Sequence, residues 1–534
     1  MKPKSACDNC RSRRRKCIRS QQGTSCRHCL ERQLPCNLTD ETVHVETGYE
    51  PVVPWTSHML THKSKLLPPK DLCHELISLY FRYIHVSFHI LFHKPSFVAA
   101  FDRGTLPRIL LFAVMGLSAR FSKHESQANI PLHERGRPFT KDAERLLNLH
   151  DVSLTTIQAC LLLGGTAVTE NETGHRAAAT ESVYFGIACR MAQLLDLPNI
   201  PASTCIEQEV NRRVWWSVYE TDTWSSTAVR LPKMMPIRVV QLPMGEQAFL
   251  SLPISQPPDL TPNHSTDPLV AHPDALIAQS IRVGLTLSKI AQVNTQAASG
   301  AIEYSYLIRE VELIWHELQS WEANLPANMT DTEANLAYWT EREQGNIFTF
   351  VHMNYYYFCL LLFYQFIHGS VDGAGRSPLA VQFAAKCRHA ASQVCDLIHR
   401  ASQSKRSELL SSLVGHVLAI ASTVQLHIFL FGENETDRQD ARHLLERNFQ
   451  LLTLLQTYWP CIDVSFARFR AFHEACSRSQ DDSHFRMDHW MLKFLLEFAT
   501  EIPERRGDDG GDDSYHESWH QLLDKSATAS AKTL

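Results

Sequence analysis

The sequence predicts a mainly α-helical protein in which a small cysteine-rich module precedes a large helical body and a disordered acidic tail. Six of the 15 cysteines lie in the first 36 of the 534 residues. From Leu72 onward apolar residues recur at helical spacing, whereas the strand-like alternation of apolar and polar residues is scarce. A chain of this length also exceeds what one hydrophobic core usually supports. We therefore expect more than one folded unit.

Composition shifts suggest four segments. Residues 1–37 form the cysteine module. Residues 38–69 hold four prolines and few periodic apolar positions, which is typical of a linker. Residues 70–500 form the helical body. Residues 501–534 combine aspartates and glycines with a few aromatic side chains, which indicates disorder. Acidic-aromatic composition is found in many activation segments, and a tail that only aids solubility is an equally good interpretation.

Helical periodicity also marks individual stretches of the body. After the first stretch, which begins at Leu72, these are Leu106–Ser122, Lys141–Asn148, Ser153–Leu163, Ala177–Leu195, Glu207–Trp224, Leu276–Val293, Ile302–Leu325, Asn346–Ile367, Leu379–Ala401, Glu408–Phe431, Asp437–Tyr458 and Met487–Phe498. Residues 243–273 carry seven prolines and are expected to form a long irregular loop.

Charge is distributed unevenly along the chain. Residues 1–36 hold ten Lys or Arg against two acidic residues, a net charge of +8, so the remainder carries −13 of the total of −5. A basic head on an acidic body predicts a polyanionic partner for the head only. The start of the chain lacks the apolar stretch of a secretory signal. Uncharged apolar runs such as Ile109–Leu117 fall short of the roughly 18 residues of a membrane span. We expect a soluble intracellular protein without a membrane partner.

In a reducing compartment, clustered cysteines bind metal more often than they form disulfides. The nine cysteines outside the module are scattered singly, which predicts buried core positions; they are Cys73, Cys160, Cys189, Cys205, Cys359, Cys387, Cys395, Cys461 and Cys476.

The cysteine module consists of two copies of the unit C-x2-C-x6-C. Its members are Cys7, Cys10, Cys17, Cys26, Cys29 and Cys36. One tetrahedral zinc on the two CxxC pairs would leave Cys17 and Cys36 without a role. Two zinc ions need eight bonds from six sulfurs, which requires two bridging thiolates, one from each half. The spacing therefore predicts two zinc ions per chain, with a cluster charge of about −2.

The two halves differ between their second and third cysteines. Five of six residues are basic in the first half, whereas the second half is nearly neutral there; the basic residues are Arg11, Arg13, Arg14, Arg15 and Lys16. Arginine pairs with phosphate and reads guanine through O6 and N7 in the major groove. We therefore predict that the first half contacts double-stranded DNA.

This module resembles the fungal zinc binuclear cluster transcription factors, on the residues Ala6 to Cys17 and the second C-x2-C-x6-C. The resemblance implies that Cys7 and Cys26 bridge the two metals. It also implies that positions Arg13 and Arg14 read CGG-like triplets and that the protein acts in the nucleus. The chain departs from the family in the loop before the fourth cysteine, where Ser20–Ser25 reads SQQGTS without the usual proline.

The body resembles the fungal-specific transcription factor domain, or middle homology region, over roughly residues 70–470. The segments that carry this likeness are Leu79–His85, His93–Phe97, Thr156–Gly164, Gly186–Ala192, Glu209–Trp216, Leu231-Pro232 and the element from Leu318 to Pro326. The later leucine-rich helix departs from the family at Phe363-Tyr364-Gln365. Within the body we expect Trp215 and Trp216 in the core, and Arg212 and Arg213 on a helix face held by acidic partners.

Other residues of the chain allow further interpretations of its function. A small-molecule effector pocket in the helical body is a second interpretation, without assigned residues. His85, His89 and His93 lie at i, i+4 and i+8 and could share a helix face that binds metal, but their apolar neighbours and Pro95 favour packed or capping histidines. No dinucleotide, P-loop or nucleophile-elbow motif is present. We therefore expect no enzyme.

The sequence thus predicts a transcription regulator of RNA polymerase II genes, an activator of a metabolic or biosynthetic gene set that recruits transcription machinery or co-regulators. The alternative is a cofactor or interaction protein whose zinc cluster does not read DNA. Residues 38–69 lack apolar heptads and contain prolines, so dimerisation through a coiled coil after the cluster is not expected. The helical body remains open as a dimer interface.

Overall fold

The computed structural model divides the chain into two units, residues 1–67 and 68–534. In the first unit it describes Cys10, Cys17, Cys26, His28, Cys29, Arg32 and Leu67. In the second it describes residues 68–477, apart from 86–89, 168–174, 230, 237, 239, 259–274, 300–301, 368–370, 373–374, 377 and 433. Most of the predicted linker, the predicted helix Met487–Phe498 and the predicted acidic tail lie outside these residues.

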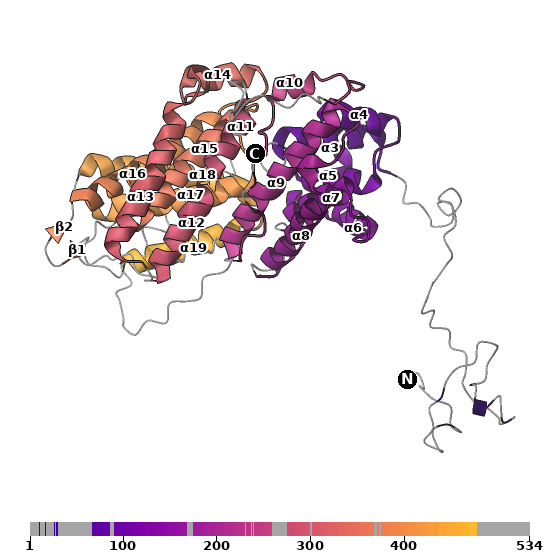
Figure 1. Cartoon of the computed structure of the whole chain (residues 1–534). Helices are drawn as coiled ribbons and strands as arrows, with labels where there is room; N and C mark the ends of the chain where they lie inside the picture. Colours follow the sequence, from indigo (N-terminus) through magenta and orange to yellow (C-terminus); the bar gives the residue numbers. More distant parts are fainter. Residues whose placement is uncertain are drawn as a thin grey trace. The chain divides into compact units, whose positions relative to one another are not determined.

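The described part of the second unit is built from helices (Figure 1). They are α3 (Lys70–Tyr83), α4 (Lys94–Asp102), α5 (Arg108–Ser118), α6 (Arg137–Leu146), α7 (Leu154–Ala167), α8 (His175–Leu194), α9 (Cys205–Val229), α10 (Glu246–Leu250), α11 (Leu276–Gly284), α12 (Leu287–Ser299), α13 (Tyr304–Ala323), α14 (Glu333–Glu341), α15 (Gly345–Phe363), α16 (Pro378–Ser402), α17 (Ser412–Phe431), α18 (Glu435–Tyr458) and α19 (Ile462–Ser477).

Shorter elements connect these helices. The 3-10 turns are η2 (Ala119–Phe121), η3 (Glu125–Gln127), η4 (Leu132–Glu134), η5 (Leu197–Asn199), η6 (Ala327–Met329) and η7 (Tyr364–Phe366). A two-residue antiparallel pair, β1 (Val371–Asp372) and β2 (Gly375–Arg376), places Val371 opposite Arg376. The expected mainly helical fold is confirmed.

Helix ends follow local chemistry where the sequence offers it. Asn434 caps α18 by accepting a hydrogen bond from the Thr436 N–H at 3.0 Å, and Glu435 and Asp437 lie in the first turn. Carboxylates at that end interact favourably with the exposed N–H groups and the helix dipole. Thr332 caps α14 in the same way through the Asn335 N–H at 3.1 Å.

Several predicted boundaries were wrong. The stretch Leu276–Val293 is not one helix, because α11 ends at Gly284, and the Thr286 hydroxyl donates to the Val283 carbonyl at the break. Gly and Thr are weak helix formers and favour helix ends. The predicted irregular loop of residues 243–273 contains the short helix α10, and helices α4, α14 and α19 were not predicted.

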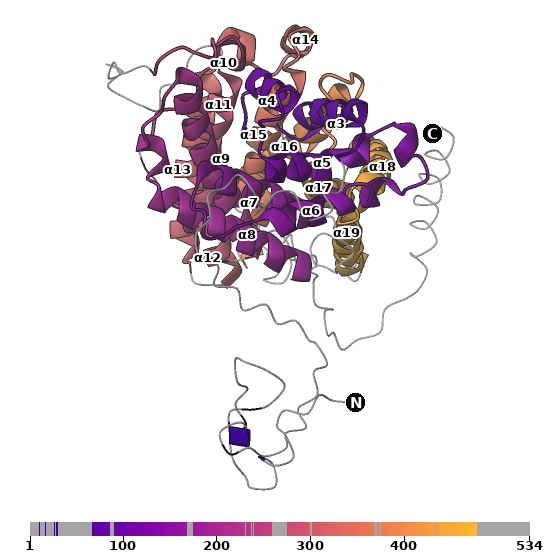
Figure 2. The same ribbon diagram turned by 90° about the vertical axis from the view of Figure 1, so that its right-hand side faces the viewer.

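The earlier and later helices form two adjoining groups, visible in Figures 1 and 2 as the indigo-to-magenta helices and the orange-to-yellow helices. In the first group α7 packs on α8, α8 on α9, and α5 on α3, α6 and α7. In the second, α15 packs on α16, and α17 packs on α16, α18 and α19. One continuous hydrophobic core runs through both groups.

Contacts between residues far apart in the sequence join the first helices of this body to its later segments. The Arg82 guanidinium donates to the Lys405 carbonyl at 2.6 Å, and the Tyr83 hydroxyl donates to Glu408 at 3.1 Å. Farther along, the buried Arg120 donates to the Tyr458 carbonyl at 3.0 Å and lies 3.9 Å over the Trp459 ring. The start of the body is therefore held against its last described helices.

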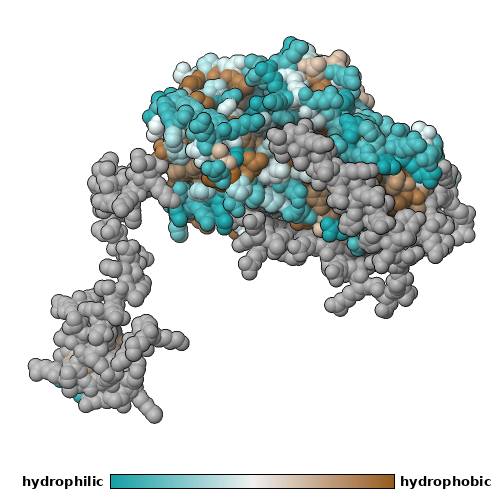
Figure 3. Space-filling view, turned by 180° about the vertical axis from the view of Figure 1, so that it is seen from behind, coloured by the Kyte–Doolittle hydropathy of each residue, from teal (hydrophilic) through white to brown (hydrophobic). Residues whose placement is uncertain are grey.

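Within the part of the chain that the structure describes, two helices are long and apolar enough to cross a membrane, which corrects the expectation that no stretch reaches this length. They span Gly345–Phe366 and Ser412–Phe431, and 89% and 78% of their most apolar windows are buried inside the body. Burial within a helical core explains this composition without a membrane, because such a helix has no solvent-facing side that needs polar residues. The described surface that Figure 3 displays is largely hydrophilic with scattered apolar residues, as is normal for a folded domain.

Candidate metal centre and nucleic-acid interface

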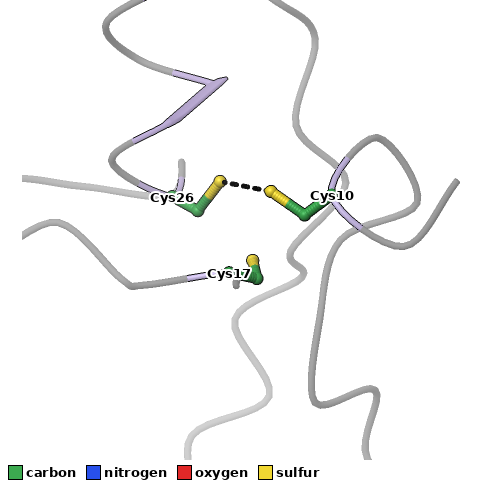
Figure 4. Close-up of side chains that lie close together, drawn as sticks. All are labelled: Cys10, Cys17 and Cys26. Atoms are coloured by element: carbon green, nitrogen blue, oxygen red, sulfur yellow. Dashed lines mark hydrogen bonds between the residues drawn. The ribbon is translucent and has the colours of Figure 1, made fainter. Parts of the chain in front are cut away.

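Three cysteines of the first unit come together although they belong to different repeats. The sulfur atoms of Cys10, Cys17 and Cys26 all lie within 4.8 Å of one another (Figure 4). The Sγ atoms of Cys10 and Cys26 are 3.6 Å apart. Cys26 comes from the second C-x2-C-x6-C unit, whereas Cys10 and Cys17 come from the first.

These sulfur positions fit a zinc ion. With Zn–S bonds of about 2.3 Å in a tetrahedron, two thiolates on the same zinc lie about 3.8 Å apart. The observed 3.6 Å between Cys10 and Cys26 agrees with that edge length. A single zinc on the two CxxC pairs would not need Cys17, yet Cys17 lies in this group. The arrangement therefore favours a cluster in which the second repeat supplies a ligand to the metal of the first.

The electrostatics of the group agree with this chemistry. Burial by itself disfavours the Cys26 thiolate, but the backbone N–H and thiol of Cys29, followed by the thiols of Cys10 and Cys17, outweigh it and lower the pKa of Cys26. Cys10, Cys26 and Cys29 are fully buried within their small module. Because a module of this size has almost no apolar core, bound zinc supplies much of its folding free energy.

Seven of the eleven predicted site residues lie outside the described residues. They are Cys7 and Cys36 of the ligand set, and Arg11, Arg13, Arg14, Arg15 and Lys16 of the DNA-contacting set. The six-cysteine ligand set and the arginine assignment therefore stay predictions. Arg32, which takes the position of Arg13 in the second repeat, is exposed.

The histidines that shared a helical spacing do not share a helix. Helix α3 ends at Tyr83, before His85, and His93 is the N-cap of α4. His93 Nδ1 accepts from the Ser96 N–H at 3.4 Å, and Pro95 lies in the first turn of α4 rather than ending a helix. His85 Nε2 accepts from the Phe92 N–H at 3.1 Å, and burial lowers the pKa of His85 to about 4. Packing and capping roles are confirmed for these two; His89 lies outside the described residues.

The segment Glu209–Trp216 lies in the first half of α9, and its side chains hold the chain that follows this helix. Arg213 is fully buried and donates to Glu209 at 2.9 Å, to Glu246 at 2.6 Å and to the Met244 carbonyl at 2.9 Å. Burial opposes the charge of Arg213, but the carboxylates of Glu246 and Glu209 outweigh it and raise its pKa. Arg212 also donates to Glu209 and, at 2.8 Å, to the side chain of Gln241. The predicted acidic partners are confirmed.

The tryptophans of this segment are core residues, as predicted. Trp215 and Trp216 are each 2% exposed, and the Trp216 indole donates to the Gln241 carbonyl at 3.0 Å. Of the nine single cysteines, eight are buried and Cys461 is partly buried. Their positions are those of packing residues.

Glu246, the second carboxylate partner of Arg213, was not predicted from the sequence. Its only signal was an acidic residue inside a proline-rich stretch, 33 residues after the arginine it pairs with. Pairing at that distance depends on how the loop folds back over α9, which periodicity does not reveal. The effector pocket remains a prediction without assigned residues.

Family models match both parts of the chain. The fungal Zn(2)-Cys(6) binuclear cluster domain matches residues 5–43, and the fungal specific transcription factor domain matches residues 77–321. Together they cover more than half of the sequence. The second match ends with α13, so the later helices lie outside it.

Similar proteins include three from two fungi. An uncharacterized transcriptional regulatory protein of Schizosaccharomyces pombe is 24% identical over 466 residues, covering 74% of this chain and 47% of that protein. A second from the same organism is 23% identical, covering 76% and 52%. A Zn(2)-C6 fungal-type transcription factor of Fusarium oxysporum f. sp. lycopersici, FTF1c, is 21% identical, covering 74% and 45%. The chain thus spans about half the length of these curated relatives.

No solved structure matches the chain. The two domain matches and the names of the relatives nevertheless agree with the sulfur geometry of the first unit. The cluster domain binds two zinc ions, and its family consists of transcription factors rather than enzymes. The chain belongs to the fungal Zn(2)-Cys(6) binuclear cluster transcription factors.

Proposed function

We propose that this protein is a nuclear, sequence-specific DNA-binding regulator of RNA polymerase II genes that reads CGG-like triplets. The observation that carries the proposal is the meeting of Cys26 from the second repeat with Cys10 and Cys17 from the first. A two-zinc cluster held in this way fixes the first repeat as a rigid support for its basic residues.

The proposed ligands of the two zinc ions are all six cysteines of the module, with Cys7 and Cys26 as the bridging pair. Arg13 and Arg14 are the proposed base-reading residues, because bidentate arginine contacts to guanine discriminate bases. Arg11, Arg15 and Lys16 are the proposed phosphate contacts, which position the module without reading sequence. The regulated genes are proposed to be a metabolic or biosynthetic set under activation.

The partners follow from the same assignment. Double-stranded DNA binds the first unit, and transcription machinery or co-regulators bind elsewhere. A small-molecule effector of the helical body is a second interpretation, without assigned residues. We place the domain limits at 1–37, 38–69, 70–500 and 501–534.

Selection of bound sequences from random double-stranded DNA by the full chain tests the proposal. We expect enrichment of a CGG-like triplet and an affinity that falls steeply with salt, because phosphate contacts release counterions. Arg14→Ala should reduce discrimination at one guanine by about 1–3 kcal/mol.

Arg32→Ala is the matched control, since it removes one positive charge from the second repeat. It should weaken binding to all sequences similarly or not at all. Zinc-loaded protein that enriches no sequence would support the alternative, a cofactor or interaction protein that uses the cluster without reading DNA. Unchanged site preference in both variants would exclude Arg14 as the reading residue.

A further inference from the structure

The segment after α9 places a lysine in an unusual setting within the helical body. Lys233 is half-buried, and its amine lies 3.5 Å from the centre of the Tyr219 ring of α9. Its hydrogen bond goes to the Ser288 hydroxyl of α12 at 3.3 Å. In the described part of the chain this amine forms no ion pair within 4.0 Å. With one neutral hydrogen-bond partner among the described residues and an aromatic face, this ammonium group is poorly compensated for burial.

The backbone around Lys233 is fixed from two sides. The Asp222 carboxylate accepts the N–H groups of Met234 and Met235 at 2.9 and 2.7 Å. The Gln193 side chain of α8 donates to the Met234 carbonyl at 2.8 Å. The lysine stem therefore enters the junction of α8, α9 and α12 from a segment whose main chain is tied down, and its amine is held in place.

The ionisable groups at this position differ in their reactivity. Burial lowers the pKa of Lys233 to about 8, although the charge of Asp222 opposes this. Burial raises the pKa of the neighbouring Cys189 thiol, so that thiol is a poor nucleophile. The Tyr219 hydroxyl is buried and, among the described residues, has no hydrogen-bond partner.

We propose that Lys233 is a covalent acceptor site for a small aldehyde or ketone, which it binds as an imine. The neutral amine attacks the carbonyl carbon, a C–N bond forms, and the C–O bond then breaks. The oxygen leaves as water together with the two protons of the amine, so no oxidant or reductant is needed. A desolvated lysine is the side chain that performs this reaction in proteins.

This setting differs from that of the other lysines suited for comparison. Lys289, which follows Ser288 on α12, is half exposed and lies 2.7 Å from both carboxylate oxygens of Glu317. Lys386 is also half-buried and lies 4.5 Å from the centre of the Trp315 ring. Lys386 therefore shows how an aromatic neighbour affects the labelling of a half-buried lysine. Lys289 shows how fast an accessible lysine in an ion pair is labelled.

The proposal concerns the helical body and is independent of DNA reading. The full-length protein is incubated with propanal and cyanoborohydride at pH 7, and the reduced adducts are quantified by peptide mass spectrometry. An amine with a pKa of about 8 is neutral in about one molecule in ten at this pH, against about one in 2,500 for an ordinary lysine. Allowing for burial, we expect Lys233 to be labelled at least about tenfold faster than Lys289 and Lys386. Equal or slower labelling of Lys233 overturns the proposal.

A variant tests the physical cause. Ser288→Asp places a carboxylate beside the Lys233 amine, which favours the ammonium form, so labelling of Lys233 should fall severalfold while that of Lys386 stays constant. Ser288→Asn is the matched control and should leave the preference for Lys233 intact. If Ser288→Asp left Lys233 labelling unchanged in folded protein, the neutral, poorly compensated amine would not be the source of reactivity and the proposal would fail.

Discussion

Replacing Arg213 by alanine is expected to lower the free energy of unfolding of the helical body by about 3–5 kcal/mol, the range measured when one partner of a buried ion pair is removed. The side chain is fully buried, bonds two carboxylates and a carbonyl, and lies 4.0 Å over the Phe249 ring. The two carboxylates are affected unequally. Glu209 keeps Arg212 and the Met244 N–H, whereas Glu246 loses its ion pair. The expected value is therefore near 3 kcal/mol.

Urea unfolding followed by tryptophan fluorescence measures this effect, because Trp215 and Trp216 lie on the same helix. A second substitution, Glu246→Gln, in the Arg213→Ala background removes the stranded charge and should restore about 1–2 kcal/mol. Arg442→Ala is the control, since its pair with Glu446 at 3.1 Å is largely exposed and should contribute less than about 0.5 kcal/mol. If Arg213→Ala cost no more than Arg442→Ala, the ion pair would not hold the 241–249 segment on α9.

The pH dependence of this effect has a definite sign. Burial tends to raise the pKa of Glu246, but the charge of Arg213 outweighs it, so the folded-state pKa lies below the ordinary 4.5. A depressed carboxyl pKa stabilises the folded state above its unfolded pKa, and this stabilisation is lost as the pH falls through the folded value. The stability gap between wild type and Arg213→Ala should therefore be widest near pH 7 and narrow below about pH 4.5. A gap that widens in acid would contradict the assignment.

Three further predictions concern packing, metal and assembly. Gly164→Ala places a Cβ 2.2 Å from the Phe185 ring, so this variant should lose about 1–3 kcal/mol of stability in thermal melts. Gly165→Ala on the same helix is the control, because its Cβ meets only ordinary contacts at 3.7 Å. It should be neutral or stabilising by up to about 1 kcal/mol. Metal analysis should find two zinc ions per chain, and chelation should abolish DNA binding; one zinc with two reactive thiols would disprove the binuclear centre. The fragment 1–70 should bind one triplet-like half-site weakly as a monomer in sedimentation and gel-shift experiments, because prolines interrupt any coiled coil after the cluster; cooperative binding of two half-sites by this fragment would contradict that.

The amino-acid sequence by itself determined the domain class and the metal chemistry. Six cysteines at a repeated spacing limit the possible zinc stoichiometry, because ligand number and type are properties of the chain. Helical periodicity located most of the body's helices, because the apolar face of a helix is encoded by the spacing of residues within one continuous segment. It did not reveal the break between α11 and α12, where a Gly and a Thr interrupt an apolar pattern that continues beyond them. Short elements such as α10 also escaped it.

Only the tertiary structure decided which distant residues meet. It brought Cys26 beside Cys10 and Cys17, paired Arg213 with Glu246 across 33 residues, and placed the Lys233 amine against Tyr219 and Ser288. It also decided that the apolar helices α15 and α17 lie in a core. Burial and pairing depend on how elements pack, and the charge state of a buried group follows from the partners that packing supplies. The spacing of residues within one segment specifies neither burial nor pairing.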